Sequence, residues 1–439
     1  MRKLIFSIIT TVVLSTSSYA TESVDFKTVW NTIKSSHPEL KSSHEELSAA
    51  EAASARSDRH WLPQVYFSGK GFNTNDPAYS FMGNLGQRSI TAADFSPASL
   101  NHPSNQNFAQ FGLGMNLPIY EGGSSVALHE VQEFQLASKE SANSEAQIDV
   151  YSSLVSSYAN VLNSESALSS LEDLKVKVKS VLSRYSLGSK SNPVGYSGLL
   201  GLKSILNRIE ALINQMEMKK SSSKNEIVQR SSAFQKEFDV KKQDSGQFLS
   251  EVLPSTSIIG AESSFGITTA ESGVEMSKAM VSMERARFLP QLGLFSEGNM
   301  TTGSRSTGTS YVGGLYFKWS LFNPKDFGSV GEASHRHEAA VAKLENARVS
   351  EKIAREQLES SLVTIQENEK ILNSSTQLMN EQVETAAKLF QSGSINALQL
   401  VEVFNRRADL IFQVQELNQN HIQIRTQLAK ISRLKGISL

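Results

Sequence analysis

The sequence contains no cysteine among its 439 residues. This absence excludes disulfide frameworks, thiol catalysis, cysteine-based zinc sites, iron–sulfur clusters and a lipid anchor attached through cysteine. A dominant charge is also lacking, because 43 Lys and Arg residues balance 44 Asp and Glu residues to a net charge of −1. Nucleic-acid-binding proteins usually carry a basic excess, so no nucleic-acid partner is expected.

Long hydrophobic runs are scarce, and apolar residues make up only 39% of the chain. One apolar run, from Leu4 to Leu14, follows Arg2 and Lys3 and precedes a serine-rich stretch that ends at Ala20. This pattern is typical of a secretory signal peptide, and the run is shorter than the roughly 20 residues that a membrane-spanning helix needs. We expect a signal peptide over residues 1–20, with an uncleaved anchor as the alternative. Any membrane insertion of the mature chain would then use strands.

The sequence contains the same order of segments twice. Leu62-Pro63-Gln64 and Leu289-Pro290-Gln291 each lead into a strand-like run, and each half continues with a polar loop, a second strand, a long helix, a turn and another helix. Such repetition favours a duplicated unit over two unrelated domains. We expect a first repeat over residues 21–240, a connecting equatorial segment over 241–266 and a second repeat over 267–439. The expected strands lie at about 62–73, 107–119, 289–300 and 310–322, and the hairpin tips near 185–193 and 390–396.

The second and fourth strand segments alternate with a period of two. Large apolar residues such as Phe111 and Leu113 alternate with small or polar residues such as Gly112. Over about 11 residues this is the pattern of a transmembrane strand, although an ordinary half-buried sheet in a soluble domain remains possible. Four strands cannot close a membrane barrel, because about eight is the smallest number. Several copies must therefore share one barrel, most simply a homotrimer with twelve strands.

The long segments after Gly123 and from about Glu332 lack proline and glycine for some sixty residues, which predicts helices on the order of 90–100 Å long. Apolar residues recur every seven positions, which predicts left-handed coiled-coil packing. Many companion positions are small or polar, as expected of a helical wall with water on one side. The heptad lines are Leu358, Ile365, Leu372, Met379, Ala386; Leu199, Leu206, Ile213 with Leu202, Ile209, Met216; and Leu410, Leu417, Ile424, Ile431.

Three motifs resemble the repeats of TolC-type outer-membrane factors: Leu62-Pro63-Gln64, Leu289-Pro290-Gln291 and Leu117-Pro118-Ile119-Tyr120-Glu121-Gly122-Gly123. A looser copy of the last motif spans Trp319–Pro324. The resemblance implies a mainly α fold with a transmembrane β part: a long α-helical barrel of coiled-coil hairpins joined to the twelve-stranded β-barrel of a trimer. It also implies the outer membrane of a Gram-negative bacterium as the location. The protein would be a passive exit duct for a tripartite efflux pump or a type I secretion system. Its partners would be a periplasmic adaptor, an inner-membrane pump of the RND or ABC type and outer-membrane lipid.

The resemblance further implies adaptor contacts at the two hairpin tips and a gate just past the second tip. By position, the tip residues are Leu187, Gly188, Ser189, Ser392, Gly393 and Ser394, and the gate residues are Gln399 and Glu402. A glycine at such a turn is expected to adopt a left-handed backbone. Arg406 and Arg407 are placed to pair with Glu402, so an ordinary ion pair is an alternative to a gate charge.

No motif for catalysis is recognised. His335 and His337 are two residues apart on an expected helix and would point to different faces, so a metal site is not expected. The sequence contains no H-E-x-x-H, phosphate-loop or G-x-S-x-G pattern. We expect no enzyme activity, metal or cofactor. A soluble periplasmic coiled-coil adaptor or scaffold is the main alternative function, and a secreted enzyme is a weaker one.

Overall fold

The computed structural model describes residues 23–186, 188, 191–230, 238–253 and 263–433. The expected signal peptide and part of the expected connecting segment lie outside these residues. The chain divides into two compact units, each built from segments of both halves of the sequence. We call residues 1–42, 145–264 and 352–439 the helical unit, and residues 43–144 and 265–351 the strand unit.

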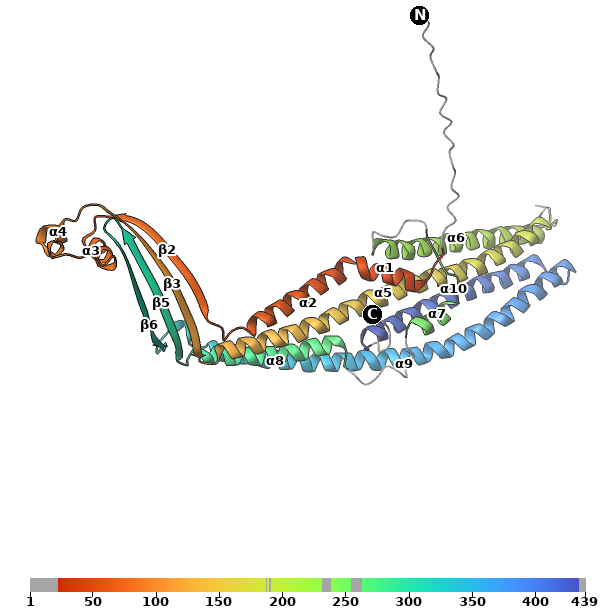
Figure 1. Ribbon diagram of the computed structural model, residues 1–439. Coiled ribbons are helices and arrows are strands. Elements are labelled where there is room, and N and C mark those ends of the chain that lie inside the picture. Colours follow the sequence, from red (N-terminus) through yellow and green to blue (C-terminus); the bar gives the residue numbers. More distant parts are fainter. Residues whose placement is uncertain (1–22, 187, 189–190, 231–237, 254–262, 434–439) are drawn as a thin grey trace, which may run out of the picture. The chain divides into compact units, whose positions relative to one another are not determined.

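The elements follow the expected order twice: α2, β2, β3, α5, α6 and then α8, β5, β6, α9, α10 (Figure 1). Among the described helices, none is both long enough and apolar enough to cross a membrane. The bounds are β1 Ser23–Val24, α1 Phe26–Ser36, α2 Pro38–Ser57, β2 Gln64–Thr74, α3 Pro77–Gly86, η1 Ala92–Phe95, α4 Pro97–Asn101, β3 Gln106–Glu121, α5 Ser124–Ser183 and α6 Pro193–Gln229. They continue with β4 Asp239–Val240, α7 Ser245–Val252, α8 Phe265–Ala286, β5 Gln291–Gly303, β6 Thr307–Lys318, η2 Pro324–Asp326, α9 Ser329–Gln391 and α10 Ala397–Lys430.

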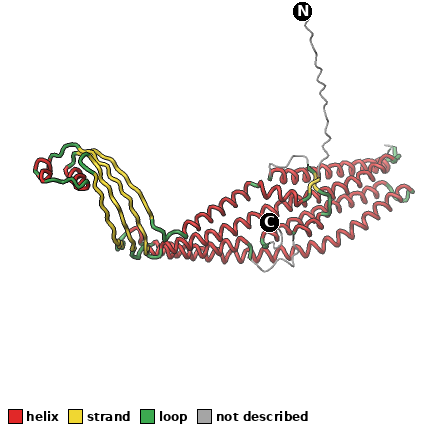
Figure 2. Tube along the Cα trace, viewed as in Figure 1, coloured by secondary structure: helices red, strands yellow, loops and turns green. Residues whose placement is uncertain are grey.

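The strand unit contains one antiparallel sheet in the order β2-β3-β5-β6, with the four strands side by side in Figure 2. Register places Phe67 opposite Leu113 and Leu294 opposite Leu315, so these large apolar residues share one face. Ser68 lies opposite Gly112, which itself lies opposite Asn299, on the other face. The alternation in the sequence therefore separates an apolar face from a polar face, as predicted.

The apolar face is not covered by the described part of the chain. The exposed fractions of Phe67, Leu113 and Leu315 are 71%, 60% and 68%. In a water-soluble sheet such residues would pack against a core, because burying a large apolar side chain contributes roughly 1.5–3 kcal/mol. Long strands with an uncovered apolar face and a polar face are instead typical of strands that contact lipid.

The structure corrects several expected boundaries. The fourth strand ends at Lys318 rather than residue 322, and the Trp319 indole N–H donates to the Phe288 carbonyl oxygen at 3.1 Å instead of lying within the sheet. The expected loop at 301–309 shrinks to three residues, because β5 and β6 pair as far as Thr302 and Thr307. The expected polar loop between the first two strands holds α3, η1 and α4, where Asp94 accepts from Arg305 at 2.7 Å. Helix-capping residues and prolines explain these helices, and prediction missed them because segments of 10, 4 and 5 residues are too short to show a helical period.

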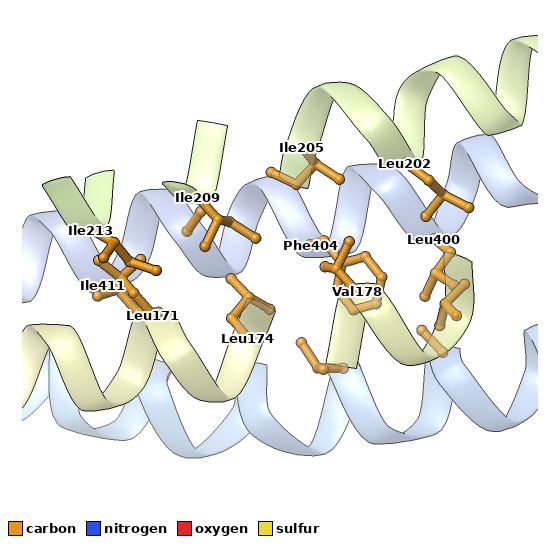
Figure 3. Close-up of a cluster of buried hydrophobic side chains, with 14 of the residues drawn as sticks. Leu171, Leu174, Val178, Leu202, Ile205, Ile209, Ile213, Leu400, Phe404 and Ile411 are labelled. Carbon is orange, nitrogen blue, oxygen red and sulfur yellow. The ribbon is translucent and has the colours of Figure 1, made fainter. Parts of the chain in front are cut away.

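The core of the helical unit lies where α5, α6, α9 and α10 pack together (Figure 3). The heptad line Leu202, Ile209 and Met216 of α6 is fully buried, as expected. In α9, Ile365 and Ala386 are buried, whereas Leu358, Leu372 and Met379 of the expected line are half-buried. In α10 the expected line is wrong at its centre: Leu417 and Ile424 are half-buried, whereas Phe404, Ala408 and Ile411 are buried. Because α10 contacts more than one neighbouring helix, its buried surface covers several heptad lines.

A second cluster of the helical unit is aromatic. Phe26 of α1 packs edge-on against Tyr158 of α5 at 5.5 Å, and Phe248 of α7 stacks on the Tyr158 ring at 4.9 Å. The Tyr158 hydroxyl donates to the Val24 carbonyl oxygen at 3.0 Å and accepts from the Lys241 N–H at 3.2 Å. Burial raises the pKa of Tyr158 to about 12, so the hydroxyl remains a donor at neutral pH.

Phe404→Ala tests the core of the helical unit. This side chain is fully buried, so its truncation removes apolar contacts and leaves a cavity, which costs about 3–5 kcal/mol. We expect faster amide hydrogen exchange in α6 and α10 and a lower denaturation midpoint. Lys203→Ala on the exposed side of α6 is the control, with an expected change within about 0.5 kcal/mol. Equal effects of the two substitutions would contradict this assignment of the core.

Candidate functional site at the tips of the helical hairpins

The first tip joins α5 to α6. Asn192 caps α6, since its side-chain oxygen accepts the Gly195 N–H at 3.1 Å, and Pro193 occupies the first helical turn, where it needs no donor. The Tyr185 hydroxyl donates to the Gly195 carbonyl oxygen at 2.8 Å and closes the turn. Gly188 lies against Leu199, because a Cβ at this glycine would be 2.8 Å from a Leu199 methyl. The other expected tip residues, Leu187 and Ser189, lie outside the described residues.

The second tip joins α9 to α10 and includes the expected residues Ser392, Gly393 and Ser394. Gly393 has φ +76°, as predicted, and its N–H donates to the Phe390 carbonyl oxygen at 3.1 Å. The Ser394 N–H donates to the Leu389 carbonyl oxygen at 2.9 Å, which completes a Schellman ending of the helix. Asn396 and Gln399 then form a capping box at the start of α10, with both hydrogen bonds at 3.0 Å. Each end of this turn is therefore specified by local sequence.

The two tips contact each other. The rings of Tyr185 and Phe390 stack with centroids 6.0 Å apart. Close by, Gly198 of α6 faces Ala397 of α10, and a Cβ on this glycine would be 2.5 Å from that of Ala397. A glycine is required there because the two helices approach too closely for any side chain.

A cavity of about 780 Å³ lies between the tips. Both turns contribute to its lining, and two of the apolar residues in it, Val194 and Leu398, are 63% and 44% exposed. Further residues of the lining include Arg184, Tyr185, Ser394 and Gln399. Exposed apolar side chains around a hollow with polar groups are typical of a binding surface.

Of the two expected gate residues, only Gln399 lines this cavity, and its side chain is engaged in the capping box. Glu402 is exposed and accepts from Arg406 Nε at 3.0 Å, so the ion pair anticipated as the alternative is present. Arg407 does not contact Glu402 in the structure. An exposed pair of this kind contributes about 0–1 kcal/mol, so Glu402 is available to other partners at small cost.

A polar link between the hairpins was not anticipated from the sequence. Arg208 of α6 donates to the Asn405 amide oxygen at 3.0 Å and also to the Asp409 carboxylate of α10. Asn405 and Asp409 are four residues apart and thus lie on one helix face. No local signal relates them to Arg208, because the partners belong to different halves of the chain. The close approach of α6 and α10 had one visible signal, the pair Gly198 and Gly201 inside a helix.

The two histidines considered as metal ligands are separated as expected. Within the described ranges, no group of three or more His, Cys, Asp or Glu residues is arranged to hold a metal ion. His335 lies 3.5 Å from Glu338, while the His337 ring lies 3.0 Å from the Ser277 hydroxyl. Both positions are explained by contacts between neighbouring side chains.

Long antiparallel strands with an uncovered apolar face are typical of a protein inserted in an outer membrane. The model of the family "Outer membrane efflux protein" matches residues 29–195 and 261–434. The chain belongs to this family and is an outer-membrane protein, as the resemblance implied. This membership argues against a soluble adaptor or a secreted enzyme. No curated protein sequence matches at a significant level.

Solved structures agree with the fold. The Campylobacter jejuni outer membrane channel CmeC is similar over 92% of this chain and 85% of that chain, with 16% identity and a TM-score of 0.74. The outer membrane protein VceC from Vibrio cholerae is similar over 93% of this chain and 96% of that chain, with 12% identity and a TM-score of 0.74. The open-state structure of the Neisseria gonorrhoeae outer membrane channel MtrE is similar over 92% of this chain and 88% of that chain, with 12% identity and a TM-score of 0.72. The expected fold class of helical hairpins joined to a β part is thus confirmed.

Gly393→Ala tests the tip. A side chain at a left-handed position costs roughly 1–2 kcal/mol, so we expect the last turn of α9 to open more often. Amide hydrogen exchange at residues 388–394 should accelerate about five-fold or more. Gly393→Asn should be milder, because asparagine tolerates this conformation. Gly273→Ala, in the interior of α8 with open space around it, is a glycine control that should not accelerate exchange. Unchanged exchange in the Gly393→Ala protein would contradict the Schellman ending.

Proposed function

We propose that three copies of the chain form the exit duct of a tripartite export system, with twelve strands in one outer-membrane barrel. The observation that carries this proposal is the four-stranded sheet, whose apolar face is uncovered and whose edge strands, β2 and β6, have no neighbour in the described part of the chain. In lipid, unpaired backbone N–H and C=O groups cost several kcal/mol each, so both edges need partners. Pairing β2 of one copy with β6 of the next closes the barrel and satisfies both.

We further propose that the cavity between the tips receives a periplasmic adaptor. Its lining combines exposed Val194 and Leu398 with the polar groups of two capped turns. The duct itself is passive, so an inner-membrane pump of the RND or ABC type supplies the energy. The cargo is either small toxic molecules or a protein substrate of type I secretion.

The gate of the duct is the polar contact that Arg208 of α6 makes with α10. Opening requires the α9–α10 hairpin to move relative to the α5–α6 hairpin, which breaks the bonds from Arg208 to Asn405 and Asp409. These groups are about half exposed, so water replaces the lost partners and the cost per link is about 1 kcal/mol. Gln399 at the cavity and Glu402 beyond it then form the polar entrance of the duct.

Paired lysine substitutions on β2 test the membrane role. Phe67 and Ser68 are neighbours on opposite faces of the sheet. Phe67→Lys places a charge in lipid at about 2–4 kcal/mol and should sharply reduce detergent-resistant trimers in the outer-membrane fraction. Ser68→Lys places it on the polar face and should leave trimers intact. Equal yields of trimer from the Phe67→Lys and Ser68→Lys chains would refute the barrel. Recovery of the wild-type chain in the soluble periplasm would refute it as well.

Cargo is tested in the same strains. Deletion of the gene should increase sensitivity to drugs, block secretion of a large protein, or do both, and the Ser68→Lys chain should restore the lost activity. Restoration by the Phe67→Lys chain at equal abundance would contradict a role for the inserted sheet. Loss of neither activity would refute the duct.

Arg208→Ala tests the gate. Loss of the link should increase channel conductance events in planar bilayers about five-fold for each link broken. The swapped pair Arg208→Asp with Asp409→Arg should return the channel towards its closed behaviour. Lys430→Ala removes a separate ion pair with Asp149 of α5, at 3.1 Å, and serves as the control with unchanged conductance. A closed Arg208→Ala channel would overturn the gate assignment.

A further inference from the structure

Arg407 is a charged residue at a core-facing position of α10. It follows the buried Phe404 by three residues and precedes the buried Ile411 by four, so it lies on the same helix face. Its neighbour Arg406 points to solvent and pairs with Glu402. The two adjacent arginines thus differ in environment, and only Arg406 has a counter-charge.

No hydrogen bond or ion pair is made by Arg407 to any described residue. The acidic residues that flank it along α10, Glu402 and Asp409, are bound to Arg406 and Arg208. On α5, Glu165 and Glu172 pair with Lys220 and Lys175. Burial lowers the pKa of the Arg407 guanidinium, because the surrounding protein solvates a charge less well than water. A half-buried cation without a partner is costly, and a bound counter-charge offsets that cost.

Arg407 lines a cavity of about 50 Å³. This is several times the roughly 10–15 Å³ that one water molecule requires, so the cavity has room for an ion and water. Its lining comes from α5, α9 and α10 and includes Asn163, Ser166, Thr376, Arg407 and Asn418.

The lining supplies donors and no carboxylate. The Thr376 hydroxyl oxygen is buried and makes no hydrogen bond within the described part of the protein. Ser166 also lines the cavity, as do Asn418 and Asn163, and the Asn418 amide donates to the Asn163 side-chain oxygen at 3.2 Å. A neutral hydroxyl can turn its proton towards an anion, whereas a cation would be repelled by the guanidinium.

We propose that the cavity beside Arg407 binds one small monovalent anion such as chloride, which bridges α5, α9 and α10. The guanidinium supplies the charge, and Ser166 and Thr376 supply hydroxyl donors from the other two helices. The ion stabilises the packing of the second hairpin against the first. This proposal is independent of the cargo and of the adaptor.

The test uses the full-length protein in detergent, exchanged into sodium gluconate and titrated with sodium chloride at constant ionic strength. Chloride should raise the apparent melting temperature by about 2 °C or more with saturation, since a ligand that binds only the folded state stabilises it. The chloride NMR signal should show a saturable excess linewidth. Absence of both effects in the wild-type protein would overturn the proposal. A carboxylate of a second copy in the cavity would give the same result, because it would take the place of the anion.

Adjacent arginines provide the matched variants. Arg407→Met keeps the apolar stem but removes the charge, and it should abolish both the linewidth and the melting shift. Arg406→Met removes an exposed charge on the same helix and should preserve both. Arg407→Lys, which keeps the charge, should retain a saturable linewidth with weaker affinity, so a poorly folding Arg407→Met protein does not remove the test. An equal chloride response in the Arg406→Met and Arg407→Met proteins would refute the site.

Discussion

Hydrogen bonding at the edges of the sheet is the constraint on which the rest of the structure depends. A strand in water can leave its outer N–H and C=O groups to the solvent, but a strand in lipid cannot. The described part of the chain has four long strands, which is half of the smallest closed membrane barrel. With an uncovered apolar face on this sheet, the single chain is an incomplete structure in the membrane. This also explains the modest apolar content, because a wall one strand or one helix thick has little interior to fill.

In the helical unit, two hairpins pack against each other. Large apolar residues such as Ile209 and Phe404 supply the adhesion, and Gly198 allows α6 and α10 to approach. The polar link of Arg208 lies beside these apolar residues, and at the tips the ring of Tyr185 stacks on that of Phe390.

Local patterns predicted the strands, their two faces and the long helices, because alternation and heptads are properties of short segments. The Gly393 turn was equally accessible, since a glycine after a helix has a direct conformational reason. The centre of the α10 core was not, because the choice of Phe404 and Ala408 over Leu417 depends on which helices pack around it. The link from Arg208 to Asp409 and the isolation of Arg407 arise from contacts between distant segments. A single sequence carries no signal for such pairs, and here it placed both arginines beside Glu402 when only Arg406 contacts it.

The small parallel pair of β1 and β4 has a consequence for biogenesis. Ser23 and Val24, close to the beginning of the chain, pair with Asp239 and Val240 in its middle, and Tyr158 bonds to both segments. These contacts close a very large loop, and loop closure of this length slows folding. The aromatic cluster of α1, α5 and α7 cannot assemble until more than half of the polypeptide has been exported. Ser23 and Val24 must therefore wait, in a compartment with proteases and chaperones, until their partner strand arrives.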